Sequence, residues 1–138
     1  MGSPRPLTKK QVLEFVARGE SLSGYDMRGI DLSGVCFDGA DLSYAKLAEC
    51  NLARSTFRGA NLRGASMWHS DCKDACFDDA SMEEADFDYS NLDGCTFRAA
   101  KVKKAIFPFN RLSLDAVMES VRTGRKVRME RGSITEDG

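Results

Sequence analysis

The sequence has few of the residues on which catalytic and metal sites depend. Its 138 residues include one histidine, His69, and one tryptophan, Trp68. It contains neither a glycine-rich phosphate loop nor a nucleophile with an identifiable base, so we expect no enzymatic activity and no cofactor. Cys72 and Cys76 form a CxxxC pair, but no second pair of ligands accompanies it, so a zinc site is not predicted.

The sequence also lacks an excess of either charge and a long apolar run. Its 20 lysines and arginines nearly balance its 21 aspartates and glutamates, so no direct binding of nucleic acid is expected. No apolar run approaches membrane-spanning length and no signal peptide is recognisable, so no membrane association is expected. The length suits one domain with a core of its own.

What the sequence does contain is a five-residue repeat. From Tyr25 to Phe109 it divides into 17 pentads without insertion or deletion, and the third residue of every pentad is apolar. A period of five fits neither an α-helix nor a long strand. It fits a short extended step in which positions one and three face inward, position two faces outward, and positions four and five turn a corner. Four such steps close a square coil, and successive coils stack at the strand spacing of ~4.8 Å.

Pentads such as ADLSY, ANLRG, ADFDY and SNLDG resemble the repeats of the pentapeptide-repeat family, and the resemblance covers 85 of the 138 residues. It implies an all-β fold, a right-handed quadrilateral parallel β-helix of about four coils. It implies less about function, because a solenoid is a scaffold for the side chains that it displays.

The four-sided arrangement places residues 20 apart on the same side of adjacent coils. The predicted structural core contains one phenylalanine stack and two leucines of the next side: Phe37, Phe57, Phe77, Phe97, Leu42 and Leu62. The inward-facing cysteines are Cys50, Cys72 and Cys95. Cys36 and Cys76 face outward, roughly 10 Å apart and too far to form a disulfide. Reduced thiols indicate a cytoplasmic protein.

A helix is predicted on each side of the repeat. The expected division is 1–19 for a tail and capping helix, 20–109 for the β-helix, 110–124 for a second capping helix, and 125–138 for a tail. Thr8 with Gln11, and Ser113, are the predicted N-terminal caps, and glycines 19 and 124 end the helices. The apolar stripes are Val12, Leu13, Phe15 and Val16 in the first helix, and Leu114, Val117, Met118 and Val121 in the second. A short strand is also predicted over 126–129.

The two helices are predicted to cover the ends of the tube, because an open solenoid end exposes core and unpaired backbone. The second helix could instead form a dimer contact, which would give a homodimer through a terminal coil or helix.

Charged outward positions show two patterns. Asp38, Arg58, Asp78 and Arg98 share the fourth position of one side, so opposite charges are expected to pair between coils. Eight carboxylates and no basic residue lie between Asp74 and Asp93. The resemblance suggests one use for such a band, since quinolone-resistance members of the family bind DNA gyrase by imitating DNA. An ordinary solvated surface is the favoured interpretation, because the rod is only roughly 20 Å long.

One group of outward aromatic residues is the candidate partner-binding surface. His69, Tyr89 and Phe109 share the fifth position of one side in successive coils, and Trp68 is beside them. Asp86 and Asp88 flank the group. Grouped exposed aromatic residues are typical of binding hot spots. The alternative is that Phe109 tucks under the C-terminal helix and Tyr89 packs on its neighbours.

The sequence therefore predicts a non-enzymatic module that binds an unknown protein partner. Two alternatives are a DNA-mimicking inhibitor of a topoisomerase such as DNA gyrase, and a structural spacer within a larger assembly.

Overall fold

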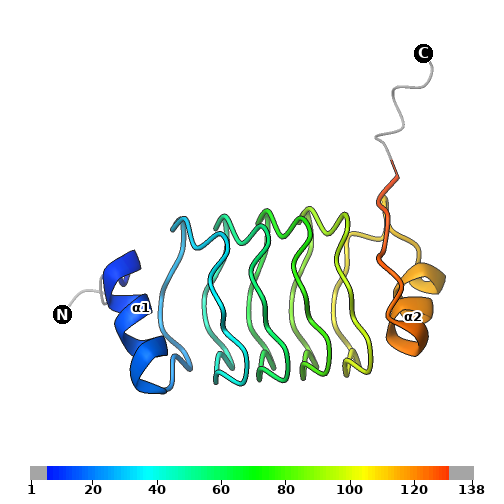
Figure 1. Ribbon diagram of the computed structural model, residues 1–138. Helices are drawn as coiled ribbons and strands as arrows, with labels where there is room; N and C mark the ends of the chain where they lie inside the picture. The colour runs from blue at the N-terminus through cyan, green and yellow to red at the C-terminus, as the bar shows by residue number, and fades with distance from the viewer. Residues whose placement is uncertain (1–5, 131–138) are drawn as a thin grey trace, which may run out of the picture.

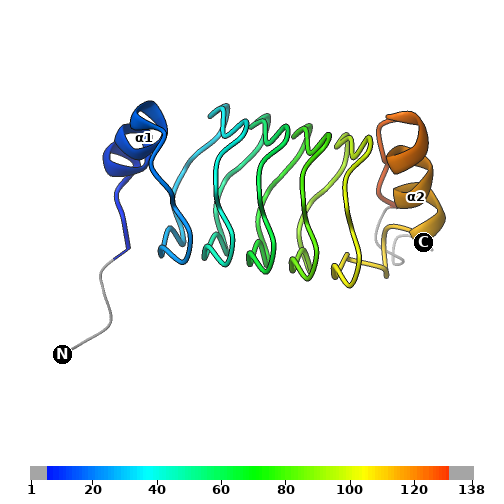
Figure 2. The same cartoon turned by 90° about the horizontal axis from the view of Figure 1, so that it is seen from below.

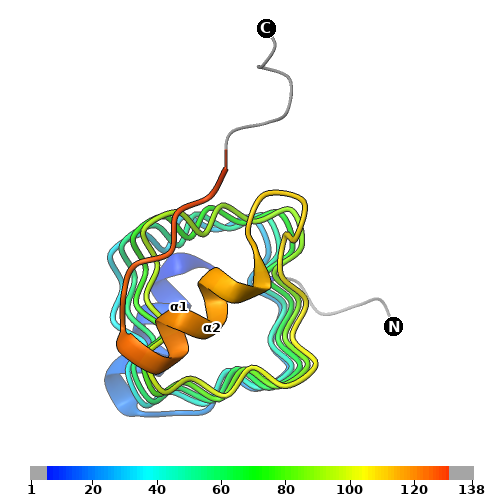
Figure 3. The same ribbon diagram turned by 90° about the vertical axis from the view of Figure 1, so that its right-hand side faces the viewer.

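The structure is a stack of four-sided coils with one helix across each end. It is a computed structural model and describes residues 6–130. Helix α1 (Lys9–Arg18) lies at one end of the stack and α2 (Leu114–Thr123) at the other, as Figures 1 and 2 show. Seen along the axis, the coils superimpose as a square outline (Figure 3).

Successive coils are joined by parallel bridges between residues 20 apart. The second residue of a pentad pairs with the second residue of the pentad one coil later, as Asp31 does with Asn51. Third-position N–H groups donate to the following coil, for example Phe57 N to Cys76 O at 2.7 Å. The predicted spacing of 20 residues is therefore confirmed. Within residues 6–130 the bridges are isolated and no longer strand forms, because a corner interrupts each side.

The corners require an unusual backbone conformation at the fifth residue. Every fifth position from 24 to 104 has a positive φ, whether or not the residue is glycine. The residue after most corners donates its N–H to the carbonyl of position three, as Ala60 N does to Phe57 O at 3.1 Å. These are the features of a type II turn. Ten of these corners are occupied by residues other than glycine. The left-handed conformation of such a residue lowers the free energy of unfolding by roughly 1–2 kcal/mol.

This conformation predicts opposite effects of two substitutions in one column of corners. Gly59→Ala adds a Cβ at φ +64° with no atom within 4 Å, so backbone strain alone should lower the free energy of unfolding, by about 1 kcal/mol. Ala99→Gly relieves the same strain at φ 57° and should raise it by a similar amount. Urea denaturation followed by circular dichroism measures both. Effects of the same sign would contradict the strain argument.

Third-position side chains fill the interior of the tube. Phe37, Phe57, Phe77 and Phe97 stack with ring-centroid distances of 5.2, 4.9 and 5.3 Å between successive coils. All six residues of the predicted core, including the two leucines, are fully buried. Phe87 of the opposite side meets Phe77 edge-on at 5.4 Å, so opposite sides are packed against each other across the tube.

Small polar residues at position one are buried but not left unpaired. Ser55 Oγ donates to the carbonyl of Leu32 at 2.8 Å. Cys50 Sγ donates in the same way to the carbonyl of Met27 at 2.9 Å. In each case the acceptor lies 23 residues earlier. Serine and cysteine can therefore replace alanine inside the tube without the penalty of a buried unpaired polar group.

The five cysteines fall into two classes of expected reactivity. Burial raises the pKa of the thiols of Cys50, Cys72 and Cys95. Cys36 is exposed and Cys76 is half-buried, and all five are free thiols. Because the thiolate is the reactive form, iodoacetamide at mildly alkaline pH should alkylate Cys36 first, Cys76 more slowly, and the others only after unfolding. Peptide mass spectrometry measures this order, and rapid labelling of Cys72 in the folded protein would contradict it.

Helix α1 lies over the first coil. Its predicted capping box is present, with Gln11 N donating to Thr8 Oγ1 at 3.2 Å and Thr8 N to Gln11 Oε1 at 2.9 Å. Val12 is fully buried in the same core cluster as the coils. Leu13, predicted on the buried stripe, is instead exposed. It points roughly 100° away from Val12 around the helix axis, so it cannot contact the coil at the same time.

Helix α2 covers the last coil with a face that matches the predicted one only in part. Val117 is buried and Val121 packs against the core as predicted, but Leu114 and Met118 are exposed, and Ser120 is buried in addition. The reason is a hydrogen bond in which Ser120 Oγ accepts from Phe97 N at 2.9 Å. In the rest of the stack such an N–H donates to the next coil. No further coil follows Phe97, so the hydroxyl of Ser120 takes the place of the missing acceptor carbonyl.

The chain after α2 returns along the last coil. Val127 N donates to Cys95 O at 2.9 Å, and Gly94 N donates to Val127 O at 2.8 Å. The predicted short strand over 126–129 is wrong, because only one residue of it pairs through both backbone groups. Residues 125–130, predicted as part of a tail, thus contact the coil; the rest of that predicted tail lies outside the described residues.

Candidate partner-binding surface

Trp68, His69 and Tyr89 form one aromatic cluster on the surface. Their ring centroids are 5.2 Å apart for Trp68 and His69, 6.0 Å for Trp68 and Tyr89, and 6.4 Å for His69 and Tyr89. Trp68 is 39% exposed and Tyr89 is 65% exposed. His69 and Tyr89 occupy corners of adjacent coils with φ of 59° and 60°, so both leave the backbone at the same edge of the tube. The coil geometry thus brings together three of the four predicted aromatic residues.

Phe109 does not join this cluster. Its ring contacts that of Phe107 at 5.9 Å, and the ring contacts of residues 6–130 include none between Phe109 and Tyr89. The run of positive φ values ends at Lys104. Phe109 N donates instead to Phe107 O at 2.8 Å as the chain leaves the coil. Phe109 is also 51% exposed, so the alternative that it tucks under the helix does not hold either.

Acidic residues adjoin the aromatic cluster in the coil before it and within it. Asp88 belongs to the next coil, and its carbonyl accepts from His69 N at 2.9 Å. Glu49 belongs to the preceding coil, and its N–H donates to Trp68 O at 2.9 Å. Asp86 Oδ1 accepts a hydrogen bond from Asp88 N at 2.9 Å, which stabilises the turn at this corner. Glu49 was not among the predicted site residues, although its spacing of 20 residues from His69 is a signal that identifies it.

The carboxylates between Asp74 and Asp93 wind around the tube. One coil contains 20 residues, so this stretch passes all four sides. Among the described residues, three of the eight take part in ion pairs: Asp78 with Arg58 at 3.4 Å, Glu84 with Arg63 at 3.7 Å, and Asp93 with Arg128 at 3.4 Å. Imitation of duplex DNA needs rows of charge along the rod, and a partly neutralised ring does not supply them.

The predicted charge ladder forms only in part. Arg58 Nη1 and Asp78 Oδ2 are 3.4 Å apart. Asp38 Oδ1 accepts from the backbone N of Arg58 at 2.9 Å, and Asp78 Oδ1 accepts from the backbone N of Arg98 at 2.9 Å. These carboxylates therefore bind the backbone of the following coil, which is a structural role.

The second-position carboxylates Asp26 and Asp31 hold their corners and are unsuited to acid catalysis. Asp31 Oδ1 accepts from Ser33 Oγ at 2.8 Å and from Ser33 N at 3.1 Å. The hydroxyl bond lowers the pKa of Asp31. The Arg28 guanidinium, 2.7 Å from Asp26, lowers the pKa of that carboxyl to about 2. A general acid needs a raised pKa, whereas both of these groups stay ionised near neutral pH.

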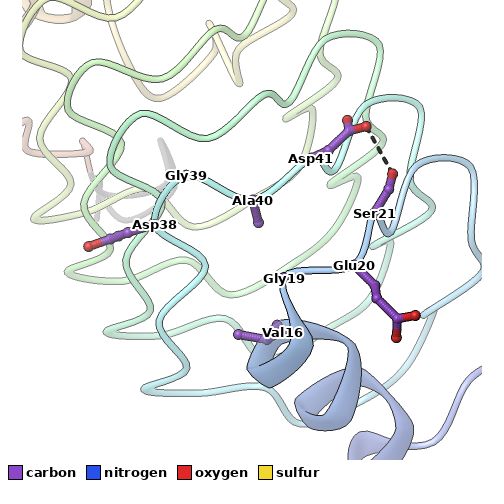
Figure 4. A pocket seen from close by; sticks show the side chains of 8 residues that line it. All are labelled: Val16, Gly19, Glu20, Ser21, Asp38, Gly39, Ala40 and Asp41. Carbon is purple, nitrogen blue, oxygen red and sulfur yellow. Dashed lines mark hydrogen bonds between the residues drawn. The ribbon is translucent and has the colours of Figure 1, made fainter.

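A cleft of about 220 Å³ lies between the end of α1 and the first coils (Figure 4). Ser21 Oγ donates to Asp41 Oδ2 at 2.9 Å, and the carboxylates of Glu20 and Asp38 point away from this pair and from each other. The acids therefore do not converge on a ligand.

Across residues 6–130, no group of three or more histidine, cysteine, aspartate or glutamate side chains is placed to hold a metal ion. No helix in the same range has the length and apolar character to cross a bilayer.

Comparison with known proteins identifies the repeat. A family model for the pentapeptide repeat region matches residues 22–107. The chain belongs to the pentapeptide-repeat family. A pentapeptide repeat protein from Nostoc is similar to it, with 25% identity, a TM-score of 0.70, and coverage of 86% of this chain and 98% of that chain. A comparison with curated proteins gives no match.

Two further solved structures resemble this pentapeptide-repeat protein less closely. One comes from the thylakoid lumen of Arabidopsis thaliana, with 30% identity, a TM-score of 0.54, and coverage of 61% of this chain and 55% of that chain. Our chain thus matches little more than half of its length. The other is QnrB1, a plasmid-mediated fluoroquinolone resistance protein, with 14% identity, a TM-score of 0.29, and coverage of 63% and 60%. A likeness this weak carries no argument about function.

Proposed function

We propose that this pentapeptide-repeat protein is a non-enzymatic interaction module that presents Trp68, His69 and Tyr89 to a protein partner. One observation carries the proposal: three aromatic rings contact one another on the surface, with Trp68 and Tyr89 substantially exposed. Aromatic residues grouped in this way are typical of binding hot spots. The backbone bonds between coils hold them at fixed spacing, which lowers the entropy lost on binding.

The remaining parts of the chain have supporting roles in this proposal. Residues 20–109 form a right-handed β-helix, and helices α1 and α2, within the segments 1–19 and 110–124, cover its ends. The protein works in the cytoplasm, where its five free thiols stay reduced. A second copy can bind through a terminal coil or helix when an end is uncovered.

A pull-down with matched variants tests the proposal. Wild-type protein, the double variant Trp68→Ala/His69→Ala, and the control Tyr44→Ala are immobilised, since Tyr44 is an exposed tyrosine on another side. We expect a partner that the wild type and the control retain and that the double variant loses by roughly thirtyfold in affinity, as for a hot spot. Circular dichroism confirms that all three are folded. An identical set of bound proteins for all three would contradict the proposal.

The two alternatives predict different results. If the acidic stretch imitates DNA, the protein should inhibit supercoiling by a topoisomerase such as DNA gyrase. We expect no inhibition even at high molar excess, because the carboxylates form a partly paired ring. A structural spacer within a larger assembly would have no partner whose binding depends on Trp68.

A further inference from the structure

We propose that the aromatic cluster binds a cationic, arginine-containing segment of its partner. This inference rests on the proposed function and adds the chemistry of what is bound. The charges around Trp68, His69 and Tyr89, and the arrangement of their rings, both favour such a segment.

The surroundings of the cluster are acidic. The two pentads that carry it, 65–69 and 85–89, and the pentad one coil earlier, 45–49, together contain three carboxylates and one lysine. None of the ion pairs among residues 6–130 involves Glu49, Asp86 or Asp88. Arg28, on the same side, is occupied by Asp26 at 2.7 Å. The charge that faces a partner here is therefore negative on balance, although the Arg28 guanidinium also interacts with Glu49.

The spacing of the coils implies that the rings and carboxylates lie within reach of one guanidinium group. Glu49 and Asp88 each belong to a coil adjacent to that of Trp68, at a spacing of ~4.8 Å. A cation within ~6 Å of an aromatic centroid is attracted to the ring face. A guanidinium can stack its plane on Trp68 or Tyr89 and still donate from its edge to a carboxylate. A lysine ammonium lacks the plane and the fork, so it should bind less tightly.

The single tryptophan of the chain makes the test direct. Because Trp68 is the only tryptophan, its fluorescence reports on this surface alone. Short oligo-arginine, oligo-lysine and oligo-glutamate peptides of equal length are titrated into the full-length protein. We expect a saturable change in Trp68 emission with oligo-arginine, binding several-fold weaker with oligo-lysine, and no change with oligo-glutamate. No saturable response to oligo-arginine, or equal affinity for the lysine peptide, would overturn the inference.

Charge-matched variants separate this surface from general attraction. Glu49→Gln/Asp88→Asn removes two charges beside the cluster, whereas Asp79→Asn/Glu83→Gln removes two elsewhere on the tube. We expect the first to raise the Kd for oligo-arginine by roughly fivefold and the second by less than twofold. Equal losses in both variants would show attraction to the whole acidic surface and would overturn the inference.

Competition distinguishes this inference from the proposed function. If oligo-arginine displaces a partner whose retention depends on Trp68 and His69, both are supported. If such a partner stays bound in excess oligo-arginine, the inference fails and the proposed function stands. If no partner depends on these residues, the proposed function fails, and the peptide titration still decides the inference.

Discussion

Replacement of Phe77 by aspartate is expected to abolish folding. The ring of Phe77 lies between those of Phe57 and Phe97 at 4.9 and 5.3 Å and is fully buried. Removing a buried phenylalanine ring alone typically costs 3–5 kcal/mol, on the order of half of a domain's whole stability of roughly 5–15 kcal/mol. An unpaired carboxylate in an apolar interior adds a desolvation cost, which the remaining stabilising interactions of the domain are not expected to offset. Far-UV circular dichroism and size-exclusion chromatography should show no native protein.

Two control variants test whether the loss of folding comes from the buried charge at position 77. Phe77→Leu retains an apolar side chain and should fold with reduced stability. Arg63→Glu loses an ion pair with Glu84, 3.7 Å long and exposed on both sides, so it should cost less than about 1 kcal/mol. A native spectrum for Phe77→Asp, or a loss of folding in Arg63→Glu, would contradict this account of the core.

Val117→Asp is expected to detach α2 from the last coil, whereas Met118→Asp should be tolerated. The two residues are neighbours in the helix, but Val117 is fully buried and Met118 is exposed. Detachment would free Phe97 N from Ser120 Oγ and Ala99 N from Val121 O, at 2.9 and 2.8 Å. A buried uncompensated charge costs roughly 3–5 kcal/mol, so the Val117 variant should lose at least about 3 kcal/mol of stability.

Light scattering measures the mass of the protein in solution, which simple destabilisation would not change. A detached α2 leaves an uncovered end with unpaired backbone donors, and such an edge pairs with other chains. The Val117 variant should therefore associate into dimers or larger species in a concentration-dependent way, while the Met118 variant keeps the wild-type mass. If both variants match the wild type in mass and thermal stability, α2 does not act as an end cap.

Much of the fold follows from local patterns. The burial of Phe57 and the outward position of Trp68 follow from their places in the pentad, and a spacing of 20 residues aligns each column. The capping box of Thr8 and Gln11 is equally local, since its two partners lie within one turn. These features are predictable because each depends on a few neighbouring residues and on a rule repeated along the chain.

The candidate site was predictable only in part. Trp68, His69 and Tyr89 meet because all three lie inside the regular repeat. Phe109 does not, because the chain leaves the coil before its corner forms. Glu49 could have been found from its column. Its relevance to the site shows only in the structure, where none of the ion pairs among residues 6–130 involves Glu49, Asp86 or Asp88.

The sequence by itself determined the four-sided tube and the side of it on which each repeat residue lies, because one short pattern recurs 17 times with no change of period. Only the tertiary structure decided which faces of the helices are buried, where the tube ends, and which charges are paired. Ser120 illustrates the reason, since a polar residue turns inward to satisfy Phe97 N, which lies in the last coil. Such contacts join segments that share no period, so they depend on how the whole chain packs.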